Sequence, residues 1–597
     1  MRFLPLLSGL FLCASAALAQ VLPVRQDLFS FSVISTLDET LDQGIFRLHM
    51  RSERPAEVNY ELLDLDGQPV ADAVFRFKGE TVSFTDTIPS IRKWSAETPE
   101  LYTLRLRVNG KTADYPVGFR QAGTAGAPDG VLLVNGQPVR LREVSLDGFT
   151  PGPARKDMLE ELRRMKAANI NTVRTGNAPL PPGFCELCDS LGFYVRPEGA
   201  DSTFSVSNHP CVLPPGSGEP ETVPRWERIR APRHPGYDEA RHRFQDISIT
   251  GIDPVEGLFS IRNGFCFRDL GGYIVRWRLE RNGRKVKKGK LTFTTPAGCS
   301  ETFTIQIPRR KLRKKGEYRI LFETVTARPF PALPKGTVVA LDEVFVKDTG
   351  VRKPFKAGKK AVTVSDGDST VRLTAPRAHL VFDKAEGIVT RYTFKGADVI
   401  APDFGLRPVF PGDPAGQPAV SVGEGTLCAT YPLQDGNALQ AEYTLLPGGQ
   451  LKVSATILNT GEKPLEAPQT GFRFRVKENG FRYFGRGPGE SGGDRCDGLF
   501  KSVYSSKASD AFCSANPPRE TGCHPETRWL ATGTLTVVAD SLFTFSARRF
   551  AAEDLDRKEV PERDFTETGI SAAGPSLGFT LVPARAMKTR KAIRYTF

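Results

Sequence analysis

The chain has 597 residues, enough for several domains, because domains usually hold about 100 to 200 residues each. Charged residues make up 25% of it and hydrophobic residues 40%, which excludes a long disordered chain, a collagen and a multi-spanning membrane protein. The net charge is +13, and a basic run extends from Arg309 to Lys315. No aromatic residues interrupt this run and no nucleic-acid-binding motif accompanies it, so we interpret it as a solvated hairpin or strand edge and expect no nucleic-acid partner.

Residues 1–19 have the pattern of a cleavable export signal. Arg2 precedes an apolar run that ends at Leu12, which is too short to span a bilayer, and Ala17 and Ala19 fit a signal-peptidase site. We therefore expect a mature chain that begins at Gln20 and is exported to the periplasm or the outside of the cell. Contact with a membrane is expected only during export.

Residues 24–122 contain short alternating strands broken by turns such as Asp66-Gly67 and Asn109-Gly110. This period-two pattern over about a hundred residues predicts an antiparallel, immunoglobulin-like β-sandwich. It is the first predicted domain.

Residues 123–205 change to a pattern of strands alternating with helices. We predict strands at 140–146, 171–174 and 193–196 and helices at 155–168 and 182–191, and this βαβαβ order indicates a parallel sheet. The next stretch, 206–240, is crowded with proline and glycine and is interpreted as a linker.

The rest of the chain returns to alternating strands. Residues 241–350 predict a second immunoglobulin-like sandwich, with Asn282-Gly283 as one of its turns. Residues 360–597 show no trustworthy helical period, and their length predicts a larger, many-stranded β-sandwich.

Nine cysteines would remain after cleavage of the signal. Cys185 and Cys188 form a CxxC within the second predicted helix, but no second pair at zinc-ligand spacing accompanies them. We interpret them as residues that pack on a helix face, and the odd number and wide spacing of the cysteines do not resemble a disulfide-dense framework. An oxidising compartment would still permit a bridge.

Three groups of segments together resemble the glycoside hydrolase family 2 β-galactosidases. In the family's order, they are 94–104 with 118–120 and 133–139, then 165–174 with 187–195, and then 483–490 with 494–495 and 528–530. The resemblance implies a mostly β multidomain protein, with two immunoglobulin-like β-sandwiches flanking a partial (β/α) barrel remnant, followed by a large galactosidase-type sandwich. It also implies hydrolysis of terminal non-reducing β-D-galactose residues in β-D-galactosides.

The catalytic barrel of this family has only a partial counterpart in the chain. A complete (βα)8 barrel needs about 250 residues, whereas only 123–205 resemble one. The retaining mechanism uses two carboxylates about 5 to 5.5 Å apart, and in the family both lie on later barrel strands. We therefore expect both catalytic glutamates to be missing, and we expect no counterpart of the family's N-terminal jelly-roll domain.

Supporting positions of the family site differ as well. Ser202 aligns with the glutamate that binds magnesium in the family, and serine is a poor replacement for an anionic ligand, so we expect no metal and no cofactor. Ala573 aligns with the tryptophan on which galactose stacks in the family.

Four residues at the predicted strand ends remain candidates for a site. Asp147 and Glu198 follow the first and third strands and are weak substitutes for the missing carboxylates, with solvated or arginine-paired carboxylates as the alternative. Arg174 and Asn177 follow the second strand and are candidate sugar ligands, although Arg174 can equally be a structural ion-pair partner.

Three hypotheses follow from the resemblance. The chain is a catalytically dead, truncated pseudoenzyme, or a carbohydrate-binding or scaffold protein, or an active galactosidase that uses a substitute acid pair or a complementing chain. We favour the first.

Overall fold

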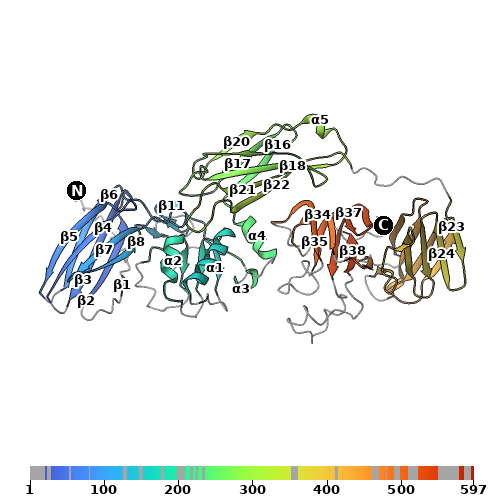
Figure 1. Ribbon diagram of the computed structural model, residues 1–597, viewed down its shortest axis with the longest axis horizontal. Helices are drawn as coiled ribbons and strands as arrows, with labels where there is room; N and C mark the ends of the chain where they lie inside the picture. Colours follow the sequence, from blue (N-terminus) through green and yellow to red (C-terminus); the bar gives the residue numbers. More distant parts are fainter. Residues whose placement is uncertain are drawn as a thin grey trace, which may run out of the picture.

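The computed structural model describes most of the chain beyond residue 19. The described residues are 20–22, 29–52, 55–78, 81–124, 131–146, 152, 154–175, 180–197, 209–214, 219–223, 226–230, 235–350, 361–410, 414–459, 470–478, 480–489, 498–507, 522–548, 577–583 and 593–597. They are mostly β and form several sheets arranged along an elongated molecule (Figure 1). This confirms the fold class predicted from the sequence.

The first unit is a sandwich of two four-stranded antiparallel sheets. One has the order β1-β2-β3-β6 and consists of Gln20–Leu22, Phe29–Leu37, Gln43–Ser52 and Thr81–Pro89. The other has the order β5-β4-β7-β8 and consists of Pro69–Phe77, Ala56–Leu63, Tyr102–Val108 and Lys111–Val117. Alternate residues of β3, among them Phe46, Leu48 and Met50, are buried between the sheets, as period-two patterning requires.

A small antiparallel sheet leads from this sandwich to an α/β unit. The small sheet consists of β9 (Ala122–Gly123), β10 (Leu133–Val134) and β11 (Gln137–Pro138). The elements of the α/β unit are β12 (Arg142–Ser145), α1 (Arg155–Ala167), β13 (Thr172–Arg174), α2 (Phe184–Leu191), β14 (Tyr194–Arg196), β15 (Glu221–Thr222), α3 (Trp226–Ile229) and α4 (Pro235–Arg243).

The four strands of the α/β unit form a parallel sheet of order β14-β13-β12-β15. The middle residues of β12, β13 and β14 lie in register, are fully buried and share a core with residues of α1 and α2; they are Val144, Val173 and Val195. The residues that alternate with these valines point to the opposite face, because successive side chains of a strand alternate. That face is polar and carries Glu143 and Arg174.

Part of the stretch interpreted as a linker belongs to this packed unit. Strand β15 pairs with β12, and Trp226 of α3 is fully buried and donates a hydrogen bond from Nε1 to Glu161 Oε2 of α1 at 2.8 Å. Tyr237 of α4 donates to the Arg164 carbonyl at 3.0 Å. Proline is tolerated here because it opens helix α4 at its first position, where no amide partner is needed.

The second sandwich follows α4. Its sheets have the orders β16-β17-β20 and β19-β18-β21-β22. The elements are β16 (Ile247–Asp253), β17 (Leu258–Asn263), β18 (Tyr273–Arg281), β19 (Arg284–Leu291), β20 (Ser300–Thr304), α5 (Arg309–Leu312), β21 (Glu317–Thr326) and β22 (Val338–Asp348).

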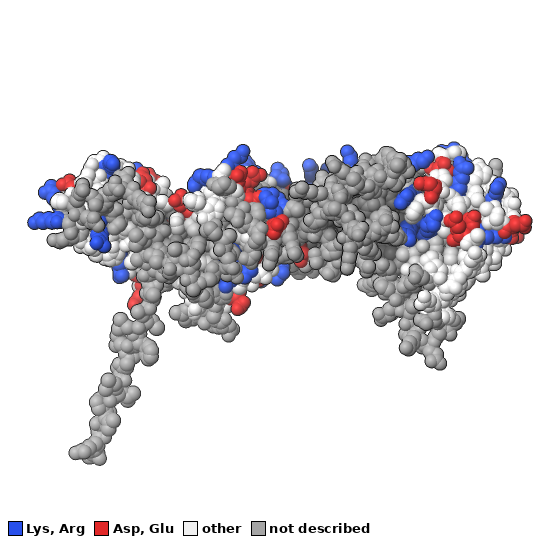
Figure 2. Space-filling view, turned by 90° about the horizontal axis from the view of Figure 1, so that it is seen from below, with Lys and Arg blue, Asp and Glu red and all other residues white. Residues whose placement is uncertain are grey.

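The basic run lies on the surface but not in a hairpin. It begins with the short helix α5, which starts after Pro308, and the Arg309 side chain is 76% exposed. On the face that Figure 2 shows, basic and acidic side chains of the described residues are interspersed. The basic run is therefore solvated, as expected, although its local structure differs from the prediction.

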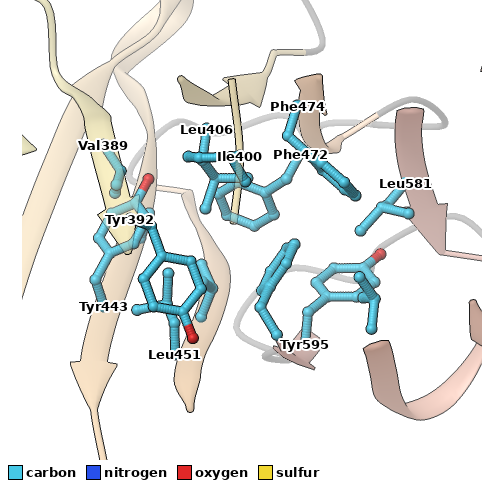
Figure 3. Packing of buried hydrophobic residues seen from close by; sticks show 14 of the residues in the cluster. Val389, Tyr392, Ile400, Leu406, Tyr443, Leu451, Phe472, Phe474, Leu581 and Tyr595 are labelled. Atoms are coloured by element: carbon cyan, nitrogen blue, oxygen red, sulfur yellow. The ribbon is translucent and has the colours of Figure 1, made fainter. Parts of the chain in front are cut away.

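The C-terminal unit joins seventeen strands into one hydrogen-bonded system. They are β23 (Thr363–Asp366), β24 (Thr370–Ala375), β25 (Ala378–Asp383), β26 (Ile388–Phe394), β27 (Ala397–Asp398), β28 (Leu406–Val409), β29 (Ala419–Gly423), β30 (Thr426–Pro432), β31 (Asn437–Leu445), β32 (Leu451–Asn459), β33 (Gly471–Val476), β34 (Gly480–Gly487), β35 (Phe500–Lys507), β36 (Cys523–Thr532), β37 (Leu535–Arg548), β38 (Leu577–Pro583) and β39 (Ile593–Thr596). Its core is rich in aromatic rings, with Tyr443, Phe472 and Tyr595 packed edge to face (Figure 3).

A buried ionic network joins the second sandwich to the C-terminal unit. The Glu317 carboxylate of β21 is 1% exposed and lies 2.5 Å from Arg319, 3.1 Å from Arg528 and 3.6 Å from Lys501. Burial alone would raise the pKa of Glu317, but Lys501, Arg319 and Arg528 together hold it below its ordinary value. The network fixes how the two units meet, because the last two cations lie on β36 and β35.

Candidate functional site

The carboxyl ends of the parallel strands meet at one edge of the α/β unit. Ser145, Arg174 and Arg196 lie side by side there, because Ser145 is in register with Arg174 and Arg174 with Arg196. The ladder continues one residue further, with Leu146 N donating to Arg174 O and Thr175 N to Arg196 O, both at 3.0 Å. This is the edge at which barrel enzymes carry their active sites.

Two arginines at this edge share one buried carboxylate. Arg196 Nη1 donates to Glu143 Oε2 at 2.8 Å, and Arg174 Nε lies 3.6 Å from Glu143 Oε1. The Glu143 side chain is only 3% exposed, whereas those of Arg174 and Arg196 are 37% and 27% exposed. The carboxylate is thus held by cations on its neighbouring strands and is poorly placed to attack a substrate.

The edge therefore has more positive than negative charge among its described residues. Glu221, the other carboxylate on the parallel strands, lies at their opposite end, where it pairs with Arg140 at 2.7 Å. Two half-exposed guanidinium groups can donate hydrogen bonds to sugar hydroxyls or to an anion. A pair of free carboxylates, which glycoside hydrolysis requires, is not found among the described strand residues.

Of the residues predicted for a site, Arg174 is the one that the structure describes. It is placed as an ion-pair partner of Glu143, one of the two interpretations left open by the sequence, and a role in sugar binding stays a prediction. Asp147, Asn177, Glu198, Ser202 and Ala573 lie outside the described residues. Their roles, and the expected loss of the magnesium site, stay predictions as well.

The strand order of this sheet resembles that of the first three strands and the last strand of a (βα)8 barrel. In a (βα)8 barrel the first strand lies between the second and the last. Here the first strand, β12, lies between the second strand, β13, and the last parallel strand of the unit, β15. Helix α3, which follows β15, packs on the same side of the sheet as α1. Only residues 197–220 separate β14 from β15, less than one βα unit of roughly 30 residues.

The outer edge of β14 is covered by a later segment of the chain. Val195 N donates to Cys211 O at 2.8 Å, and Leu213 N donates to Val195 O at 2.9 Å. Asp189 of α2 holds this segment by accepting a hydrogen bond from Cys211 N at 2.9 Å and by pairing with His209 Nδ1. Burial alone would lower the pKa of His209, but its hydrogen bond with Asp189 raises it above the ordinary value.

Sequence reasoning missed Glu143 and Asp189. Both are fully buried acids, 2% and 1% exposed, whose partners are far away along the chain. The place of Glu143 in a strand predicted to belong to a parallel sheet was a usable signal, since parallel sheets are covered on both faces and buried acids need partners. Asp189 offered no such signal, because it occupies a helix position that is usually solvated.

Among the described residues, no group of three or more histidine, cysteine, aspartate or glutamate side chains is placed to hold a metal ion. None of the helices described is long and apolar enough to cross a bilayer.

Four models of known protein families match consecutive parts of the chain. They are "Glycosyl hydrolases family 2" at 27–120, "Glycosyl hydrolases family 2, TIM barrel domain" at 128–231, "Beta-galactosidase, domain 4" at 259–347 and "Beta galactosidase small chain" at 374–568. The barrel match includes β15, in agreement with the strand order.

Similar proteins of known name are β-galactosidases. One from Priestia megaterium is 20% identical over an alignment of 719 residues that covers 84% of this chain and 69% of that protein. Since this alignment is longer than the chain, it contains long gaps on this chain's side. β-Galactosidases from Actinobacillus pleuropneumoniae and Pseudoalteromonas haloplanktis are 32% and 39% identical, over 31% and 21% of this chain and 18% and 13% of their own length.

Among solved structures, a β-glucuronidase from Ruminococcus gnavus in complex with D-glucuronic acid is similar over 30% of this chain and 35% of that chain, with 18% identity and a TM-score of 0.26. The four matched models follow one another along the chain, and each lies on one of its four units. The chain is a β-galactosidase-like protein of glycoside hydrolase family 2.

Proposed function

We propose that this chain is an exported β-galactosidase-family protein whose hydrolytic activity is strongly impaired or lost. The observation that carries the proposal is the open sheet β14-β13-β12-β15, in which the first and last strands are neighbours and too few residues remain between β14 and β15 for further units. In the family, the two catalytic glutamates lie on later barrel strands. This chain has no room for those strands between residues 197 and 220.

The chemistry of the remaining edge supports the same proposal. Glycoside hydrolysis by retention needs one carboxyl group that can give up a proton and a second that is free to attack. Glu143 is tied to Arg174 and Arg196, so it is suited to neither task. Without such a pair, most of the rate enhancement of a glycosidase is lost.

Hydrolysis of a chromogenic β-galactoside by protein made in a galactosidase-free host tests the proposal. We expect no release of chromophore above a buffer blank. Turnover that is abolished by Asp147→Asn or Glu198→Gln, but kept by Glu186→Gln on the exposed side of α2, would replace the proposal by an active enzyme with a substitute acid pair.

Sugar binding is tested separately. Because Ala573 aligns with the family's stacking tryptophan, we expect no saturable binding of galactose by calorimetry at millimolar sugar. Saturable, galactose-specific binding would favour a carbohydrate-binding protein instead.

Export is a further part of the proposal. Strand β1 begins at Gln20, the residue that the cleavage motif would make the first of the mature chain. Intact-mass measurement of protein recovered from the periplasm should give a chain that begins at Gln20. A periplasmic chain that still begins at Met1 would contradict it.

A further inference from the structure

We propose that Cys185 and Cys211 form a disulfide bond that fastens residues 209–213 to the open edge of the parallel sheet. Cys185 is the second residue of α2, and Cys211 lies in the segment that pairs with β14. The structure holds both as thiols, with Cys211 Sγ 3.6 Å from the Cys185 carbonyl oxygen. The Cys211 thiol therefore points to the first turn of α2, where Cys185 lies.

The surroundings of the two cysteines keep them together. Asp189, one turn along α2 from Cys185, accepts hydrogen bonds from the backbone and side chain of the partner segment, at Cys211 N and His209 Nδ1. On its other side, Cys211 is hydrogen bonded through its carbonyl oxygen to Val195 N at 2.8 Å. Both sulfur-bearing residues are thus fixed by contacts that do not depend on the sulfur atoms.

Cys185 is the more reactive of the two thiols, as the first attack on an external oxidant requires. Cys185 is partly exposed, and the hydrogen bond from the Cys211 thiol, helped by nearby His209, lowers its pKa against the effect of burial. Cys211 is fully buried, and burial raises its pKa. Cys185 is therefore the thiol that first meets an external oxidant.

The oxidant belongs to the class of small or protein disulfides, RSSR. The Cys185 thiolate attacks one sulfur of RSSR, forming a mixed disulfide and releasing one RS⁻. The Cys211 sulfur, after loss of its proton, then attacks the Cys185 sulfur and releases the second RS⁻. The two protein thiols are oxidised to one disulfide, RSSR is reduced to two RSH, and these carry the two protons.

The position of the bond explains what it would do. Loss of the next barrel strand leaves the edge of β14 without its family neighbour, and unpaired strand edges attract other chains. Residues 211–213 take that place through Val195, and a covalent link from Cys211 to α2 holds them there. The link closes a loop between residues 185 and 211, and such a cross-link restricts the opened chain.

Cys188 is the rival partner and provides the matched control. It lies one turn beyond Cys185 on α2, but it is fully buried in the core of the α/β unit, and burial raises its pKa well above the ordinary value. A bond between Cys185 and Cys188 would leave Cys211 unlinked. The three possible pairs are therefore distinguishable by which peptides become joined.

A peptide map of the full chain tests the bond. The protein is incubated in a glutathione buffer rich in the oxidised form, free thiols are alkylated under denaturing conditions, and the chain is cleaved after glutamate without reduction. Cleavage after Glu186 and Glu198 places Cys185, Cys188 and Cys211 on three different peptides. We expect the peptide that ends at Glu186 to be joined to the one that begins at Gly199, and reduction to separate them.

Variants and hydrogen exchange complete the test. Cys185→Ala and Cys211→Ala should each abolish the joined pair, whereas Cys188→Ala should keep it. In the oxidised protein the amides of Val195 and Leu213 should exchange roughly a hundredfold or more slowly than in the reduced protein, because the bond restricts opening of the segment.

Three results would overturn the proposal. They are a joined pair that includes Cys188, full alkylation of all three cysteines under denaturing conditions after oxidation of the folded protein, and equal exchange of the two amides in the oxidised and reduced chains. All three are measured on the unmodified chain, so they decide the matter even if a cysteine variant does not fold.

Discussion

Replacement of Glu143 by glutamine removes the negative charge that Arg174 and Arg196 share, without changing the size of the side chain. Removing one partner of a buried ion pair usually costs about 3 to 5 kcal/mol, because the other partner is left buried and uncompensated. The two arginine side chains keep 37% and 27% exposure, so water can solvate them in part. We therefore expect Glu143→Gln to lower the free energy of unfolding by about 3 kcal/mol, the lower end of that range.

Glu221→Gln is the matched control. Glu221 lies on the same sheet and pairs with Arg140 at 2.7 Å, but these side chains are 37% and 53% exposed. Exposed pairs contribute about 0 to 1 kcal/mol, so this variant should unfold almost like the unmodified chain. Urea unfolding followed by tryptophan fluorescence measures both, because two of the four tryptophans, Trp94 and Trp226, lie in the core that packs on this sheet.

The shared ion pair also predicts an energetic coupling between Glu143 and Arg196. Arg196→Gln added to Glu143→Gln should cost less than the sum of the two single changes, because each removes the same ion pair. If Glu143→Gln unfolds at the same urea concentration as Glu221→Gln, the carboxylate is not the anchor of this edge. The inference that it is unavailable for catalysis would then fall as well.

Three further changes test other parts of the structure by urea unfolding. Gly192→Ala should destabilise far more than Gly110→Ala, because both have positive φ but a Cβ at Gly192 would lie 2.4 Å from a backbone oxygen whereas Gly110 faces open space; equal losses would refute this. Glu317→Gln should lower the free energy of unfolding at pH 7 more than Glu323→Gln on the same strand does. Because the folded-state pKa of Glu317 is lowered from 4.5, this difference should fade as the pH falls below 4.5. A difference that persists at lower pH would contradict the prediction. Burial raises the pKa of Asp342 from 3.8 to about 7, so between these pH values the folded protein binds more protons at this residue than the unfolded chain does. The free energy of unfolding should therefore fall as the pH rises from 3.8 to about 7. Asp342→Asn should remove that fall, and an unchanged pH profile in this variant would count against the prediction.

The regular part of the α/β unit could be predicted from the sequence almost residue by residue. The helix expected at 155–168 is Arg155–Ala167, and Met158, Leu162 and Met165, whose helical spacing indicated it, are all buried. Its strands are short but lie beside helices with clear periodicity. Local patterns suffice where each element buries one continuous face.

The closing elements of the unit could not be predicted in this way. Strand β15 has only two residues, and it is a strand because it meets β12, not because of its own pattern. Trp226 opens a four-residue helix between stretches rich in proline, and its burial depends on Glu161, which is 65 positions away. Proline content therefore misled the interpretation, since tertiary contacts overrode a local signal.

The α/β unit also connects the domains on either side. Trp94, at the end of the first sandwich, donates from Nε1 to the Asp189 carbonyl of α2 at 2.9 Å. Asn169, at the end of α1, donates to the Val339 carbonyl of the second sandwich at 2.8 Å, and the buried Arg142 pairs with Asp246 at its entrance. These contacts use the helices and the amino-terminal side of the sheet. They lie at the opposite end of the strands from the edge at which barrel enzymes carry their active sites, so the loss of catalytic units that we propose would leave the domain arrangement intact.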